Sequence, residues 1–69
     1  SKMSWILDGK KVRADYLGIA VVGTVTDSRV KYGGKVEYTL KLDEAIRLPW
    51  STEKRTVVLV DCDELKEFV

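Results

Sequence analysis

Histidine, asparagine and glutamine are absent from this 69-residue chain, and cysteine, proline and methionine each occur once. Without histidine there is no Ser-His-Asp or Cys-His catalytic arrangement and no imidazole metal ligand. The single thiol, Cys62, permits neither an internal disulfide nor a tetrahedral zinc site within one chain. No segment has the spacing of a glycine-rich nucleotide-binding loop. We therefore expect no catalytic function, no cofactor and no metal.

Long apolar runs are missing as well. No stretch approaches the roughly 20 apolar residues of a membrane span, and the chain does not open on a signal-peptide pattern. A lone cysteine is typical of a reducing compartment. We predict one domain over residues 1–69, located in the cytoplasm and without membrane contact. Ser1 and Lys2 stand ahead of Met3, and whether they belong to the native chain stays open.

The chain also lacks a clear excess of positive or negative charge, because its formal net charge is only +1. The basic residues are concentrated in the first half of the chain and the acidic residues in the second half. A domain that binds a polyanion usually has a stronger basic excess. The overall charge therefore decides nothing about a local basic patch.

What the chain does contain is a long hairpin over residues 18–42. Residues 35–42 alternate strictly, with Val36, Tyr38, Leu40 and Leu42 on one face, as expected for a strand with one wet face. Gly33 and Gly34 supply the positive φ angles of a tight reversal. Gly23 interrupts the first arm and indicates a bend or a close approach of another backbone.

The remaining segments are short. Asp8-Gly9 predicts a first hairpin whose arms are residues 5–7 and 10–17, with Trp5 in the core. Residues 43–54 contain Pro49 and are interpreted as a connector. Residues 55–60 predict a strand buried on both faces at its middle, and residues 61–69 a short helix with Leu65 and Phe68 on its docking face.

The predicted fold class is all-β: a five-stranded barrel with a long central hairpin and a short C-terminal helical turn. It resembles the SH3-like barrels, which include the KOW and Tudor modules. The resemblance rests on residues 22–26 around Gly23, on Gly34-x-Val-x-Tyr-x-Leu-x-Leu-Asp43, and on Arg55-x-Val-x-Leu-Val60 followed by Glu64-Leu65. The pattern implies no particular activity. The small single-domain format also resembles accessory proteins of tailed phages.

Two stretches are candidate binding sites. Arg47, Pro49 and Trp50 form a candidate protein-binding site, because exposed tryptophan and arginine are enriched at interface anchors; the alternative is a tryptophan folded over one end of the barrel. Arg29, Lys31, Tyr32 and Lys35 form a candidate nucleic-acid-binding site, with cations for phosphate and a ring for stacking. Its alternative is a solvated hairpin end whose lysines discourage edge-to-edge association.

The densest carboxylate cluster is Asp61-Cys62-Asp63-Glu64. It has oxygen ligands for a divalent cation but lacks the spacing of a calcium-binding hand, so we interpret it as an acidic first helical turn and Cys62 as a small packing residue.

The leading hypothesis is a small regulatory module that binds a protein of a host gene-expression or replication machine, in the host cytoplasm if the chain is viral. The alternative is a weak nucleic-acid binder without sequence preference. We expect a monomer or a weak homo-oligomer.

Overall fold

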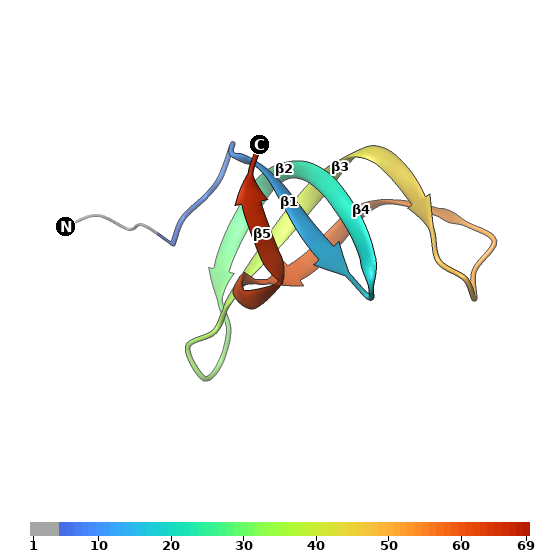
Figure 1. Ribbon diagram of the computed structural model, residues 1–69. Coiled ribbons are helices and arrows are strands. Elements are labelled where there is room, and N and C mark those ends of the chain that lie inside the picture. The colour runs from blue at the N-terminus through green and yellow to red at the C-terminus, as the bar shows by residue number, and fades with distance from the viewer. Residues whose placement is uncertain (1–4) are drawn as a thin grey trace.

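The computed structural model describes residues 5–69, so the question of Ser1 and Lys2 lies outside the described part. Within it, five antiparallel strands form one sheet in the order β4-β3-β2-β1-β5, which confirms the all-β prediction (Figure 1). The elements are β1 (Lys11–Tyr16), β2 (Ile19–Val30), β3 (Val36–Arg47), β4 (Lys54–Asp61), the 3-10 turn η1 (Cys62–Glu64) and β5 (Leu65–Phe68). The hydrogen-bonded ladder does not close, because β4 and β5 remain its two edges. Within residues 5–69 no helix is long and apolar enough to cross a membrane.

The long hairpin is formed by β2 and β3, as predicted. Lys31 N–H donates to the carbonyl of Lys35 (2.7 Å), and Gly33 and Gly34 have φ angles of 98° and 90°. The second arm is longer than predicted, since β3 continues to Arg47 through part of the expected connector. The register of the β3–β4 ladder shifts between Lys41 and Ile46, and this irregularity lets β3 bend and still pair with β4 on both sides of it.

The first hairpin is β1–β2, and its turn is Leu17-Gly18 rather than Asp8-Gly9. Leu17 and Gly18 have φ angles of 52° and 84°, the pattern of a two-residue hairpin turn. The prediction for Asp8-Gly9 was therefore wrong as a hairpin. It does make a turn, with Lys10 N–H donating to the Leu7 carbonyl (2.9 Å), but residues 5–7 are not a strand.

The core lies inside the curl of this sheet and follows the period-two alternation. β3 supplies Tyr38, Leu40 and Leu42 to it, as their spacing predicted. The other buried members of the cluster are Val12, Ala14, Val21, Val25, Val58 and Val60. Trp5 is only partly buried, so the expectation that it belongs to the core was wrong; its carbonyl instead accepts a hydrogen bond from the Tyr38 hydroxyl (2.7 Å).

The C-terminal segment is mostly strand. The helical turn is confined to Cys62–Glu64, where the Glu64 carboxylate accepts a hydrogen bond from the Asp61 N–H (2.7 Å). β5 then pairs with β1, with Phe68 opposite Val12. The prediction of a helix over residues 61–69 was thus too long, and Phe68 is exposed instead of docked, whereas Leu65 packs against the core.

β4 differs from the prediction in its burial. Val58 and Val60 are buried, but Val57 and Leu59 are 47% and 51% exposed. The reason is that the outer face of the sheet has no covering layer here, so the β4 side chains that alternate with Val58 and Val60 face solvent. The structure therefore leaves two large apolar side chains of β4 open to solvent.

Candidate protein-binding site

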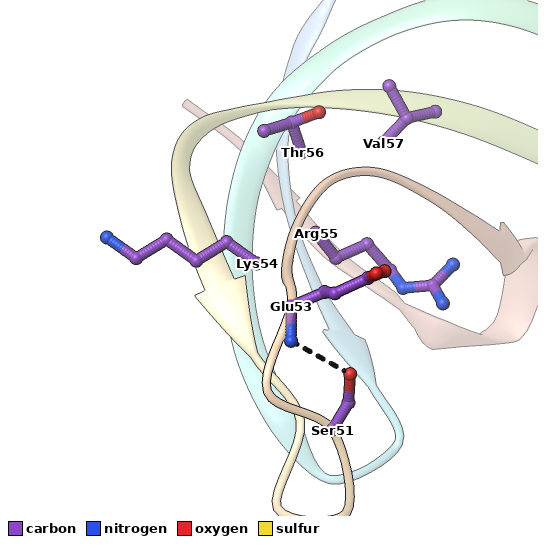
Figure 2. A pocket seen from close by; sticks show the side chains of 6 residues that line it. All are labelled: Ser51, Glu53, Lys54, Arg55, Thr56 and Val57. Atoms are coloured by element: carbon purple, nitrogen blue, oxygen red, sulfur yellow. Dashed lines mark hydrogen bonds between the residues drawn. The ribbon is translucent and has the colours of Figure 1, made fainter.

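The β3–β4 loop, residues 48–53, joins two strands that pair with each other and carries the exposed ring of Trp50. Figure 1 shows it reaching away from the body of the sheet. Leu48 is buried and anchors the loop, and its carbonyl accepts a hydrogen bond from Ser51 N–H (3.0 Å). The Ser51 hydroxyl oxygen in turn accepts one from Glu53 N–H (3.1 Å; Figure 2). Internal bonds of this kind hold a loop in one conformation before any partner arrives.

Trp50 lies in the turn of this loop and is 70% exposed. The sequence left open whether Trp50 is exposed or folded over one end of the barrel, and the structure shows it exposed. The buried residue of this loop is Leu48 instead. Arg47 and Pro49 are exposed as well. The structure thus brings the three predicted residues of this candidate site, Arg47, Pro49 and Trp50, onto one short accessible segment.

Beside the loop, the start of β4 lines a recess of about 320 Å³. Its walls are Ser51, Glu53, Lys54, Arg55, Thr56 and Val57 (Figure 2). In Figure 2 the side chains of Lys54 and Arg55 point to opposite sides of the strand. The sequence analysis did not include these two cations in the site.

Lys54 stands directly opposite Arg47 in the β3–β4 ladder. Like charges facing each other across two strands are destabilising. None of the ion pairs formed within residues 5–69 includes Arg47, Lys54 or Arg55. These three cations at the base of the loop are therefore held in no ion pair within the described residues, and Glu53 is the acid that lines the recess beside Lys54 and Arg55. The sequence signal for them was the Lys54-Arg55 pair directly after the loop.

The tip of the long hairpin is different, because each of its predicted cations has a carboxylate partner. Lys31 Nζ lies 2.8 Å from Asp61 Oδ1, and Lys35 Nζ lies 3.0 Å from Asp63 Oδ2. The guanidinium of Arg29 lies 3.3 Å from a carboxylate oxygen of Glu37. Tyr32 is fully exposed between them in sequence.

The pairs formed by Lys31 and Lys35 attach the hairpin tip to the end of β4 and to η1. Hydrogen bonding to Asp61 and to Asp63 raises the pKa of Lys31 and of Lys35, respectively, and the bond from Lys35 lowers the pKa of Asp63. The acidic cluster thus serves to hold the hairpin. No group of three potential metal-ligating side chains occurs within residues 5–69, and Cys62 is exposed, so its interpretation as a packing residue was wrong.

These ion pairs predict a defined pH response. Because the pKa of Asp63 is lowered in the folded chain, the folded state binds fewer protons there than the unfolded state, and this stabilisation is lost as the pH falls below 3.8, the unperturbed value. We expect Asp63→Asn to lose less stability between neutral and acid pH than the wild type, measured by urea unfolding. Asp27→Asn, on the exposed part of β2, is the control and should follow the wild type. Identical pH profiles for Asp63→Asn and the wild type would contradict the prediction.

Comparisons with protein-family models, with curated proteins and with solved structures find no match to this chain. The candidate site therefore rests on the geometry alone.

Proposed function

We propose that this chain is a non-catalytic binding module that recognises a protein partner through the β3–β4 loop. The observation that carries the proposal is Trp50, 70% exposed in a loop held by its own hydrogen bonds and by buried Leu48. Tryptophan is enriched among the few residues that supply most of the binding energy in protein interfaces. Exposing such a side chain in a pre-ordered loop gives a partner a large contact area at low entropic cost.

The charges around the loop define the chemistry of the partner. Arg47, Lys54 and Arg55 have no acidic partner within the described chain, and Arg47 faces Lys54. A carboxylate placed between Arg47 and Lys54 would relieve the repulsion and accept charge-assisted hydrogen bonds from both. The best-matched ligand is an acidic protein segment that also carries an apolar side chain for the Trp50 ring.

The fold supports an SH3-like module as the scaffold of this proposal. The five antiparallel strands, the long β2–β3 hairpin and the short helical turn near the C-terminus agree with the pattern on which the resemblance rests. An origin in a tailed phage, a cytoplasmic location and action on host gene-expression or replication machinery also remain part of the proposal. They rest on the small single-domain format and the single cysteine.

The proposal is tested by selecting binders from a library of acidic peptides with the wild-type chain and measuring their affinities for two variants. We expect Trp50→Ala to weaken binding about 30-fold or more, since loss of an interface anchor costs about 2 kcal/mol or more. Tyr32→Ala removes an exposed aromatic at the opposite hairpin tip and should change nothing. A folded Trp50→Ala chain that binds as tightly as the wild type would refute the assignment.

Nucleic-acid binding through Arg29, Lys31, Tyr32 and Lys35 is the alternative function. A phosphate at this tip would have to displace Glu37, Asp61 or Asp63 from an existing ion pair, which weighs against it. A titration with single- and double-stranded oligonucleotides, followed by amide NMR, distinguishes the two functions. Salt-sensitive shifts confined to residues 29–35 would support the alternative, because phosphate contacts release counterions.

A further inference from the structure

The outer edge of β4 is hydrogen-bonded to no other strand within residues 5–69, and its sequence is unusually apolar for such a position. Residues 56–60 read Thr-Val-Val-Leu-Val, without a charge, a proline or a glycine. Val57 and Leu59 are half exposed on the outer face. Edge strands normally carry a lysine, a proline or a bulge, because an open apolar edge invites pairing with another chain. β4 has no such device within its central five residues.

The charges at the two ends of β4 have opposite signs. Lys54 and Arg55 begin the strand, and Asp61 ends it. In an antiparallel pair of two identical strands, the basic start of each lies beside the acidic end of the other. β4 is therefore complementary in charge to a second copy of itself. This complementarity indicates that the strand pairing with the open edge is β4 of another copy of the chain.

The register of such a pair follows from the same residues. If Val58 lies opposite Val58 of the second copy, then Arg55 faces Asp61 and Val57 faces Leu59 of that copy, each on the outer face. A register centred on Val57 would place Arg55 opposite Leu59 and Asp61 opposite Glu53, so neither Arg55 nor Asp61 would face an opposite charge. A register centred on Leu59 would bring Asp61 against Val57 and would extend the pairing into η1, which is not a strand. Only the register centred on Val58 satisfies charge, face and strand length together.

Asp61 can serve both contacts that this arrangement requires. One of its carboxylate oxygens accepts the hydrogen bond from Lys31 of the same chain (2.8 Å), and its side chain is still 31% exposed. A carboxylate has two oxygens and can accept from two cations. Arg55, which takes part in none of the ion pairs within residues 5–69, would supply the second.

We propose that β4 pairs antiparallel with β4 of a second copy of this chain, centred on Val58, to give a two-fold symmetric dimer with one continuous sheet. The contact is isologous, so each favourable pair occurs twice. It goes beyond the proposed function, because it uses the strand edge and not Trp50. Since each loop precedes its own β4, the two Trp50 loops of the dimer lie at opposite ends of the paired strands, available to two partner segments.

The test measures mass against protein concentration by sedimentation velocity. The wild type is expected to pass from 7.8 kDa to twice that mass as concentration rises. Leu59→Lys should raise the dimer dissociation constant at least about tenfold, because it sets a charge against an apolar partner twice. Leu17→Lys, at the equally exposed β1–β2 turn, is the matched control and should dimerise like the wild type. A concentration-independent monomer mass for the wild type would overturn the proposal.

Charge exchange tests the register. Arg55→Asp alone places two carboxylates opposite each other, and Asp61→Arg alone places two guanidinium groups opposite each other, so each variant is expected to stay monomeric. An equimolar mixture restores both attractive pairs and should form a heterodimer. Circular dichroism verifies that each variant is folded. A dimeric Arg55→Asp variant, a monomeric mixture of folded variants, or a wild-type mass beyond two copies would each refute the Val58-centred pair. The proposed function is read separately, by peptide binding to the wild type and to Trp50→Ala, so a failure of the dimer can be distinguished from a failure of the Trp50 site.

Discussion

Leu40→Ala is expected to lower the free energy of unfolding by about 3 kcal/mol. Leu40 is fully buried on β3, between β2 and β4, so its truncation removes apolar contacts and leaves a cavity that neighbouring strands cannot close without breaking their ladders. A domain of this size has only about 3 to 10 kcal/mol of stability in total. The melting temperature should therefore fall by more than about 10 °C, measured by circular dichroism.

The matched control is Leu59→Ala, the same truncation on the adjacent strand. Leu59 is 51% exposed, so the loss should stay below about 1 kcal/mol. The comparison is made at low protein concentration, where pairing of β4 with a second copy does not contribute. Equal losses for the two variants would show that the outer face of β4 is covered in solution.

The parts of the fold that the sequence predicted are those encoded locally. Alternation over residues 35–42 identifies a strand and its buried face whatever lies beside it, and Gly33-Gly34 marks the reversal that precedes it. The burial of Tyr38, Leu40 and Leu42 confirms this interpretation. Leu17-Gly18 was missed as a hairpin turn because leucine rarely adopts a positive φ, and here the pairing of β1 with β2 imposes it.

The parts that were missed depend on partners distant in sequence. Residues 65–68 were assigned to a helix, yet pairing with β1 makes them a strand, supported by the ion pair between Arg13 and Glu67. Val57 and Leu59 were expected to be buried, because an apolar run does not reveal whether both faces of its strand are covered. Both errors concern tertiary neighbours and not local preference.

The candidate sites follow the same division. The exposure of Trp50 stayed open in the sequence because either arrangement suits a tryptophan behind a proline. At the hairpin tip the sequence showed the cations and two nearby acids, Asp27 and Glu37, but not that Asp61 and Asp63 return to the tip at the end of β4. The fold thereby leaves the Lys54-Arg55 pair, and not the predicted tip, as the cationic area without acidic partners in the described chain.

Gly23→Ala is expected to destabilise the chain by at least about 3 kcal/mol, at or beyond the upper end of the usual cost of overpacking. A methyl group at this position would lie 2.6 Å from the Lys41 carbonyl oxygen and 3.1 Å from Leu42 Cα, both backbone atoms of β3. The sequence predicted a bend or a close approach at this glycine, and the structure shows the approach of β3. Because backbone cannot rotate away as a side chain can, the two central strands must separate where Gly23 faces Leu42.

The control for Gly23→Ala is Gly34→Ala, in the turn of the same hairpin. Gly34 has a positive φ of 90° but nothing within 4 Å of the added methyl group, so only backbone strain of about 1 to 2 kcal/mol is expected. Conformational strain alone predicts that Gly34→Ala is the more damaging substitution, whereas the backbone clash predicts that Gly23→Ala is. Urea unfolding of both variants therefore distinguishes strain from clash. A Gly23→Ala chain as stable as Gly34→Ala would mean that β2 and β3 part easily at this point. The long hairpin would then be held together by its tip and by the flanking strands, not by close contact at its centre.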